Sequence, residues 1–497
     1  MQRRVVSAGL VALWTVVPAL ATSPYAQWTN GPPTDPNFFA IGVWYQNLQT
    51  SVINGYAAMH VNVYIYPDTM NATALTWIHN AGMYTVTLQD SFGLSQVNNK
   101  TIIGWFNPPD EPDNAQWNAT TQSYDPPILP ATIISQYNTL KANDPTRPVQ
   151  LNLGQGVAWN YIGRGVRSQH PEDYPATTTF TWVNGQVYHQ GYVAGSDIAA
   201  FDIYPMNEPN TASYASVFEN LSIVGYGVSR LVSWSAPNHP VWNYIETGDI
   251  QTQDSSPGPT PAQVKAEVWL SLVHGSLGIM YFCHSWSGST QISTHKLLDD
   301  PVMNPAVTAI NAQIRALAPA LNSTTALAGT ITTGTPTHEV SLDFMTKHDN
   351  GSDYLFTVAD QNSNGIAFFK DPAMAGVNAT VDVLGENRTL SMVHGAFIDA
   401  FSASAVHLYE IEGINGFTPQ LIAPIPAIPG DFDQDGDVDA DDFAVFKACW
   451  SGPDVTYAGD CGRWDFDHDG DVDLEDFAVF QRCYSGRAKP ADPNCAR

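Results

Sequence analysis

Between residues 38 and 323, apolar runs of strand length alternate with helical segments, and this alternation restricts the fold more than any other feature. It predicts a parallel sheet whose strands are joined by helical crossovers. The strand-like runs are residues 38–45, 61–66, 84–89, 102–106, 149–153, 198–204, 241–245 and 278–283. The helical segments include residues 133–142, 214–234, 261–273 and 304–321. Eight strands in a chain of this length are typical of a (β/α)8 barrel, which we expect over residues 22–323.

A doubly wound open sheet would also alternate strands with helices. Such sheets commonly carry a Gly-rich phosphate-binding loop directly after the first strand. No Gly-rich loop follows the first run of this sequence, so the closed barrel is the preferred prediction.

The helical pattern stops after Asn322. Residues 324–413 are rich in Thr, Gly and Val and contain the strand-like pieces YLFTVAD, GIAFFK, ATVDVL and AVHLYEI, which predict a small β-sandwich. Residues 414–429 contain four prolines, at 419, 424, 426 and 429, and are expected to form a stiff linker.

The first residues have the pattern of an export signal. Arg3 and Arg4 precede an apolar run, and Ala19-Leu20-Ala21 offers a small-residue cleavage site. We therefore expect residues 1–21 to be a removed signal peptide and the mature protein to be secreted, either extracellular or attached to a cell surface. No later apolar run approaches the ~20 residues that cross a bilayer, so no transmembrane segment is expected.

Charge and composition restrict the partners. The chain has 48 acidic and 20 basic residues and a formal net charge of -28, which repels phosphate backbones and argues against nucleic acid as a partner. Charged residues make up only 14% of the chain, whereas aromatic residues reach 11%. A polar, aromatic-rich and lightly charged surface suits sugars, which stack on rings and bond to amides and hydroxyls.

The C-terminal segment contains an internal repeat. DFDQDGDVDADDFAVF, from Asp431, is nearly identical to DFDHDGDVDLEDFAVF, from Asp465. Each copy has acids at positions 1, 3, 5 and 12 and Gly at position 6, the spacing of an EF-hand-like loop, and hard carboxylates of this kind select Ca²⁺. We expect two calcium ions here and no cofactor in the barrel. The candidate ligands are Asp431, Asp433, Asp435, Asp437 and Asp442 in the first loop, and Asp465, Asp467, Asp469, Asp471 and Asp476 in the second.

Four of the five cysteines stand in two equally spaced pairs, Cys449 with Cys461 and Cys483 with Cys495. In an exported chain this spacing predicts two disulfides that close small loops. The crossed pairing of 449 with 483 and 461 with 495 stays open on the sequence alone. Cys283 is left over and is expected to be a buried free thiol.

Active sites of (β/α)8 barrels lie at the C-terminal ends of the strands. After the fourth run the chain enters the turn NPPDEPDN, in which prolines bracket Asp110 and Glu111 and restrict the backbone. Retaining glycoside hydrolysis needs two carboxylates about 5 to 5.5 Å apart, and acids after the fourth and seventh strands can meet that distance. The other aromatic or acidic residues at strand ends are Trp44, Tyr45, Asp90, Tyr204, Glu246 and Trp286.

With these residues in view, residues 38–413 resemble the clan A glycoside hydrolases. The matching pieces are Asp110-Glu111-Pro112, VWNYIETG with Glu246, FDIYP and GIMYFCHSW. The resemblance implies a retaining, two-glutamate hydrolase of O-glycosidic bonds in a polysaccharide or oligosaccharide. It makes Glu111 the general acid/base and Glu246 the nucleophile. The residues expected to bind the substrate are Trp44, Tyr45, Asp110, Tyr204 and Trp286.

Two alternatives remain. A literal Asn-Glu-Pro occurs at residues 207–209, but the stretch from Glu208 to Glu246 is too short for the intervening strands and helices, so Glu111 is preferred. Asp110 stands where the family commonly has Asn. A carbohydrate-binding barrel without catalysis, tethered through its calcium module, is therefore the alternative function.

The segment from residue 430 to 486 resembles a type I dockerin, the paired calcium module of secreted polysaccharide-degrading enzymes. The resemblance implies a small helical domain over residues 430–497 and a cohesin-like protein as partner. The familiar dockerins often carry Ser or Thr at loop positions 10 and 11, whereas this chain has Ala440-Asp441 and Leu474-Glu475. The resemblance therefore carries calcium binding over to this chain but not the identity of the docking partner.

Overall fold

In the computed structural model of this protein the chain divides into two compact units, one ending at Thr324 and the other continuing from Thr325. Among the described residues no helix has the length and apolar character to cross a membrane. The expected signal peptide, much of the expected linker and the candidate ligands Asp433, Asp435 and Asp437 lie outside the described residues. The structure describes residues 23–67, 70–158, 182–183, 186–187, 189–208, 217–250, 258–287, 290–335, 338–362, 364–392, 395–419, 429–432, 438–457, 461–486, 491–492 and 495–496.

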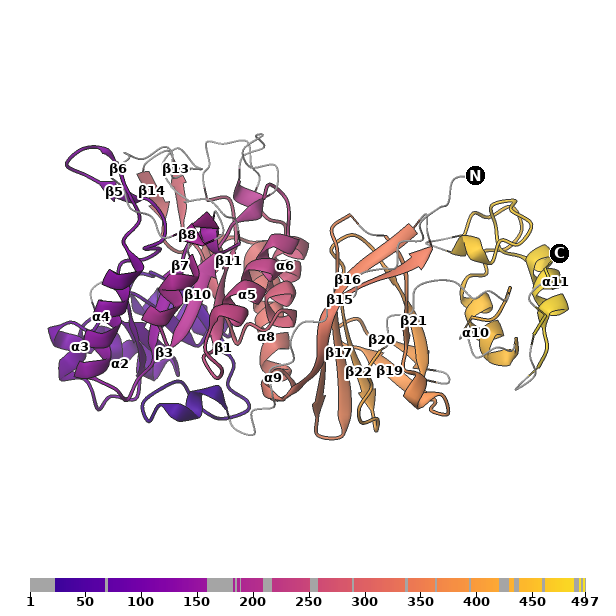
Figure 1. Cartoon of the computed structure of the whole chain (residues 1–497), viewed down its shortest axis with the longest axis horizontal. Helices are drawn as coiled ribbons and strands as arrows, with labels where there is room; N and C mark the ends of the chain where they lie inside the picture. Colours follow the sequence, from indigo (N-terminus) through magenta and orange to yellow (C-terminus); the bar gives the residue numbers. More distant parts are fainter. Residues whose placement is uncertain are drawn as a thin grey trace. The chain divides into compact units, whose positions relative to one another are not determined.

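Eight parallel strands form a closed barrel in the first unit, in the order β1-β12-β11-β10-β7-β4-β3-β2 (Figure 1). The prediction of a (β/α)8 barrel is confirmed, because each of the eight strand-like runs overlaps one barrel strand. The strands are β1 (Ala40–Trp44), β2 (Val63–Ile65), β3 (Tyr84–Thr87), β4 (Ile102–Phe106), β7 (Val149–Leu153), β10 (Ile198–Asp202), β11 (Val241–Glu246) and β12 (Gly278–Phe282).

Helices connect the barrel strands. The expected helix over residues 304–321 is interrupted at Leu317, because Pro319 starts a new helix at its second position. The helices are α1 (Thr50–Ala58), α2 (Ala72–Asn80), α3 (Ser91–Ser95), α4 (Pro130–Asn143), α5 (Ser222–Trp234), α6 (Pro261–Val273), α7 (Lys296–Asp299), α8 (Met303–Ala316) and α9 (Ala318–Asn322). Short hairpins add β5 (Gln116–Asn118) with β6 (Ser123–Asp125), β8 (Trp182–Val183) with β9 (Gln186–Val187), and β13 (Ser285–Ser287) with β14 (Thr290–Ser293).

Large side chains fill the interior of the barrel, and two glycines give them room. A Cβ on Gly42 would lie 2.2 Å from the sulfur of Met280, and a Cβ on Gly278 would lie 2.5 Å from the indole of Trp242. Met280 and Trp242 are both fully buried. The barrel is therefore a packed core rather than a pore, and an open site can form only at its ends.

Arg147, just before β7, is fully buried and ties neighbouring segments together. Its guanidinium donates to the Asp144 carboxylate at 2.7 Å and to the backbone carbonyl oxygens of Val97, Ile102 and Asn99 at 2.8, 2.7 and 2.8 Å. The same group lies 5.2 Å from the ring centre of Trp105. One buried charge thus fixes the chain on both sides of β4.

The residues after Thr324 form two antiparallel sheets, the arrangement expected for a β-sandwich. Six strands pair in the order β15-β16-β17-β22-β19-β20, and β18 pairs with β21 (Figure 1). Buried side chains from both sheets, among them Leu355, Phe369 and Tyr409, share one apolar core. The strands are β15 (Thr325–Thr335), β16 (His338–Asp349), β17 (Ser352–Ala359), β18 (Gly365–Lys370), β19 (Ala379–Val383), β20 (Arg388–Met392), β21 (Ala396–Phe401) and β22 (Val406–Glu412).

The C-terminal repeat forms two helices, α10 (Ala440–Ala448) and α11 (Leu474–Cys483), which pack through Phe446 and Phe480 at 5.4 Å between ring centres. Of the two disulfide pairings left open by the sequence, the structure has the local one, Cys449 with Cys461 and Cys483 with Cys495. Cys283 is a buried free thiol.

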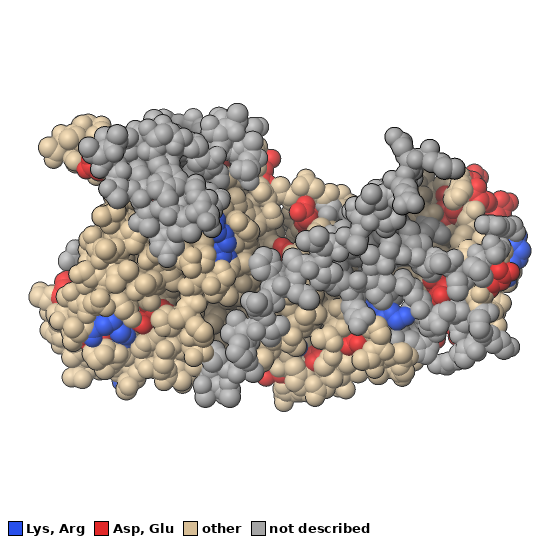
Figure 2. All heavy atoms as spheres, viewed as in Figure 1, with Lys and Arg blue, Asp and Glu red and all other residues tan. Residues whose placement is uncertain are grey.

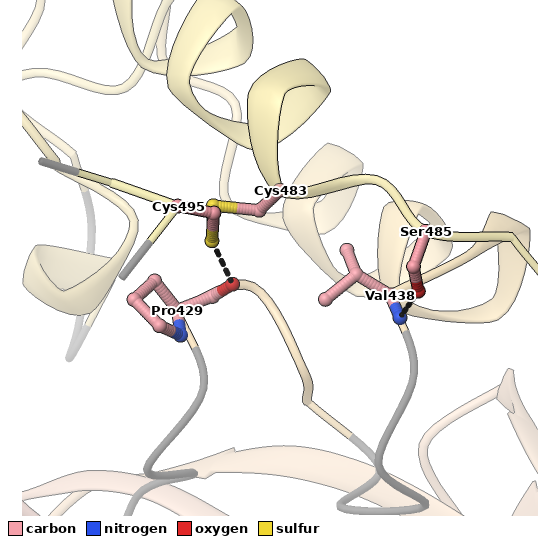
Figure 3. The surroundings of a disulfide bond; sticks show 5 residues. All are labelled: Pro429, Val438, Cys483, Ser485 and Cys495. Carbon is pink, nitrogen blue, oxygen red and sulfur yellow. Dashed lines mark hydrogen bonds between the residues drawn. A yellow bond between two sulfur atoms is a disulfide. The ribbon is translucent and has the colours of Figure 1, made fainter. Parts of the chain in front are cut away.

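The second disulfide brings the end of the chain back to the start of this module. Figure 3 shows the sulfur of Cys495 pointing at the carbonyl oxygen of Pro429, 3.6 Å away. Nearby, the hydroxyl of Ser485 accepts a hydrogen bond of 2.9 Å from the amide of Val438. The second half of the repeat is thereby attached to the first loop.

Candidate active site

A cleft of about 630 Å³ opens at the C-terminal ends of the barrel strands, where the active site was predicted. Six of the predicted site residues in the barrel line this cleft, and Glu246 does not; the six are Trp44, Tyr45, Asp110, Glu111, Tyr204 and Trp286. The other described lining residues are Tyr66, Asn114, Asn152, Gln155, Asp202, Ile203, Asn207, Glu208, Tyr244, Ile250, Phe282, His284 and Gln291.

Aromatic rings from the ends of β10, β12 and β13 form one wall of this cleft. Phe282 stacks on Trp286, with ring centres 5.7 Å apart and planes inclined by 12°, and on His284 at 5.1 Å. Tyr204 extends the row, 5.1 Å from Phe282. Burial lowers the pKa of His284, so this imidazole is neutral at pH 7. The wall is therefore an uncharged stack of flat faces, the type of surface on which sugar rings pack.

Two carboxylates in the cleft are held by one amide. The Nδ2 of Asn152, on β7, donates to Oδ1 of Asp110 at 2.9 Å and to Oδ1 of Asp202 at 3.3 Å. These two oxygens are therefore no more than about 6.2 Å apart, the sum of the two bond lengths. Asp110 follows β4 and Asp202 ends β10, on either side of β7 in the barrel order. The structure thus brings two acids within the range of a paired-carboxylate site.

Tyr204 lies close to this pair. Burial, reinforced by the charge of Asp202 and a hydrogen bond to it, raises the pKa of Tyr204 well above the ordinary value. The charge of Asp110 acts in the same direction. The phenol therefore stays protonated and acts as a hydrogen-bond donor to Asp202.

Glu111 reaches the cleft from a strained turn. Its φ of 46° lies in the left-handed region, which is costly for a side chain with a Cβ. The amide of Asn114 donates to its Oε1 at 2.7 Å, and its own backbone N–H donates to the carbonyl of Asn152 at 3.1 Å. Tyr45 and Tyr66, with φ of 44° and 46°, also line the cleft. Such strain persists where the surrounding structure holds a site in one geometry.

Glu246, the predicted nucleophile, is fully buried behind the cleft. Its Oε1 accepts a hydrogen bond of 2.8 Å from the amide of Met206, and its Oε2 accepts one from the side chain of Asn207. The residue ends its strand as expected, and in this structure its carboxylate has no exposed surface and does not line the cleft.

A second buried acid, Glu267 on α6, faces Glu246. Burial raises the pKa of Glu246 to about 7, against the lowering effect of its bonds from Asn207 and Met206. Burial and the neighbouring Glu246 raise the pKa of Glu267 well above its ordinary value. The two carboxyl groups act on each other, and a hydrogen bond between them requires a proton on one of them.

Three residues of the site and its support were not predicted from the sequence, namely Asp202, Asn152 and Glu267. Asp202 ends the sixth strand within FDIYP, so the strand-end rule that selected Glu246 could also have selected it. Asn152 lies inside an apolar run and Glu267 inside a helix, and only the closed barrel shows what these side chains meet.

The predicted calcium loops share an internal geometry. In the first, the closing acid Asp442 accepts from the amides of Phe432 and Asp439 at 2.5 and 2.8 Å. In the second, Asp476 accepts from the equivalent amides of Phe466 and Asp473 at 2.5 and 2.9 Å. Each closing acid is the third residue of its helix and completes the capping box there, because it accepts the backbone amide of the N-cap residue.

Oxygen atoms of Asp465, Asp467 and Asp476 lie within 4.8 Å of one another. One cation could contact all three carboxylates at this spacing, and an all-oxygen set suits Ca²⁺. In Figure 2 acidic side chains gather over this module.

No protein-family model and no curated protein matches the chain. Among solved structures, an α-amylase from Geobacillus thermoleovorans complexed with acarbose has 9% identity and a TM-score of 0.45, with 77% of this chain and 99% of that chain covered. α-Galactosidase I from Mortierella vinacea has 12% identity and a TM-score of 0.41, with 77% and 98% covered. A GH30 endoxylanase from Clostridium papyrosolvens C71 has 9% identity and a TM-score of 0.39, with 79% and 98% covered. Likenesses this distant transfer neither substrate nor mechanism to this chain.

Proposed function

We propose that this chain is a retaining glycoside hydrolase that cleaves O-glycosidic bonds of a polysaccharide or oligosaccharide. The observation that carries the proposal is the Asp110–Asp202 pair held by Asn152 beside a wall of stacked aromatic rings. The two oxygens are at most about 6.2 Å apart, a separation that allows the roughly 5 to 5.5 Å of retaining enzymes and lies below the roughly 6.5 to 9.5 Å of inverting ones.

In this proposal Asp202 is the nucleophile and Asp110 the general acid/base. Asn152 donates to both acids, whereas the phenol of Tyr204 donates to Asp202 and stabilises it as the anion. Two neighbouring carboxylates resist full ionisation, which favours a proton on Asp110. Asp202 attacks the anomeric carbon while Asp110 protonates the departing glycosidic oxygen. Water then attacks the glycosyl-enzyme ester, Asp110 takes its proton, and Asp202 leaves.

Glu111 remains a predicted catalytic acid, and it lines the same cleft. We prefer the adjacent Asp110 as the general acid/base, because the side-chain amide of Asn152 donates to both Asp110 and Asp202 and fixes their separation. Replacing each acid separately distinguishes the two assignments.

The function is tested by reducing-sugar release from a panel of plant and algal polysaccharides, with the full chain and its Asp202→Asn variant. We expect release by the parent protein only. Binding of a glycan by both proteins without release by either would overturn the hydrolase and favour the carbohydrate-binding barrel.

We also propose that the protein is secreted and carries a calcium-dependent docking module for a cohesin-like partner. The export pattern of residues 1–21 and the two C-terminal disulfides support secretion, since disulfides persist in oxidising compartments. The matched loop geometry around Asp442 and Asp476 supports calcium binding.

Calorimetric titration of the chelator-treated full chain should give two Ca²⁺ per molecule. Asp442→Ala and Asp476→Ala should each remove one, because the closing acid supplies the carboxylate that completes its loop. An unchanged stoichiometry in both variants would contradict the calcium assignment. The two substitutions serve as controls for each other, since they stand at the same position of the two loops.

A further inference from the structure

We propose that Glu267 is a positioning residue that, as a buried carboxylic acid bonded to the Glu246 carboxylate, holds the loops at one side of the cleft. This inference deepens the proposed function by assigning the support of its site. Glu246 ends β11 and Glu267 lies on α6, and both are fully buried.

The hydrogen-bond donors show which acid carries the proton. Glu246 accepts hydrogen bonds from the backbone amide of Met206 and the side-chain amide of Asn207, and these two donors favour the ionised form of Glu246. Within the described chain, neither carboxyl oxygen of Glu267 receives a donor from another group. Glu267 therefore carries the proton and donates it in a hydrogen bond to the Glu246 carboxylate. The negative charge of Glu246 in turn raises the pKa of Glu267.

From Glu246 the contacts run outward to the cleft. Asn207 donates to Glu246 and, at 3.0 Å, to the carbonyl of Gly248, and its Oδ1 accepts the amide of Ile250 at 2.8 Å. The carbonyl of Ile250 accepts the amide of Trp286 at 2.8 Å. Asn207, Ile250 and Trp286 all line the cleft. One buried acid pair thus supports loops after β10, β11 and β12.

The pair also predicts a direction of pH dependence. A folded-state pKa above the unfolded value means that the folded protein holds an extra proton. The stability that the protonated pair contributes is complete below the ordinary carboxyl pKa. It is lost as the pH rises through the pKa of Glu246, about 7, and then through the raised pKa of Glu267. The Tm should therefore fall less between pH 5 and pH 8 in Glu267→Gln than in the parent, since the amide cannot ionise.

Hydrogen exchange of the full chain at pH 8 tests the positioning role without any substrate. The amides of Met206 and Ile250 report on it, because they donate to Glu246 and Asn207. Glu267→Gln keeps a donor, so both amides should retain the parent's protection. Glu267→Met keeps the volume but has no donor, so protection at both should fall by about tenfold or more, with α4 unchanged.

Equal protection in the Gln and Met variants would overturn the proposal, because filling the volume would then suffice. If Glu267→Met does not fold, infrared spectra of the parent and Glu267→Gln decide. A protonated-carboxyl band at pH 8 in the parent and not in Glu267→Gln supports the pair, and no such band in the parent overturns it. Failure here leaves sugar release by the parent intact, so it is distinguishable from failure of the hydrolase.

Discussion

Replacing Asp202 by Asn should lower sugar release by roughly 10⁴-fold while glycan binding remains. The amide keeps the shape and a hydrogen-bonding atom beside Asn152 and Tyr204, but it cannot form the ester with the anomeric carbon. The measurement is the initial rate on whichever panel polysaccharide the parent degrades, with binding measured on the same polysaccharide.

Matched variants identify the remaining roles. The rate of sugar release by Asp110→Asn should be lower by roughly 10²- to 10⁴-fold, the usual contribution of a general acid/base. The fall in rate on the alkaline side of the pH profile, where the acid loses its proton, should also disappear. Glu111→Gln should retain more activity than Asp110→Asn. Asp202→Asn with near-parental activity would contradict the mechanism, and a larger loss in Glu111→Gln than in Asp110→Asn would restore Glu111 as the acid/base.

Replacing Arg147 by Met should lower the free energy of unfolding of the barrel by about 3 to 5 kcal/mol. The substitution fills most of the volume but removes the donors to Asp144, Val97, Ile102 and Asn99. Asp144 is itself buried, and its carboxylate would lose its charged partner. Denaturant unfolding followed by tryptophan fluorescence gives the change directly.

Arg315→Met is the matched control for that experiment. Arg315 is an exposed arginine on α8 that approaches the ring of His60 at 3.2 Å. Its replacement should change the unfolding free energy by no more than about 0.5 kcal/mol, as is usual for exposed positions. Equal midpoints for Arg147→Met and Arg315→Met would contradict a structural role for the buried guanidinium.

The barrel could be predicted because its strands are buried on both faces and read as continuous apolar runs. Residues 102–106 and 278–282 show this most clearly, since β4 and β12 occupy these runs. The cleft residues that directly follow strands, such as Trp44 and Tyr204, could be predicted for the same reason. A strand end fixes which end of the barrel a residue is on.

The position of a residue at the end of a strand does not determine whether its side chain points into the cleft or behind it. Asp202 and Glu246 both end barrel strands, yet Asp202 lines the cleft and Glu246 is enclosed by Met206, Asn207 and Glu267. That difference depends on the path of the loop around residues 205–207, which covers Glu246. No periodicity in the sequence carries that information, because the covering residues lie in the turn after a neighbouring strand and on helix α6.

The single amide between Asp110 and Asp202 has a consequence for inhibitor chemistry. Because both carboxylates accept hydrogen bonds from Asn152, one side chain of β7 holds their oxygens together, and a cation between those oxygens would favour the charged form of both. A six-membered ring with a protonated nitrogen at the anomeric position would place its cation between them and its flat face on the wall formed by Phe282 and Trp286. The proposed function therefore predicts that iminosugar cations inhibit this chain.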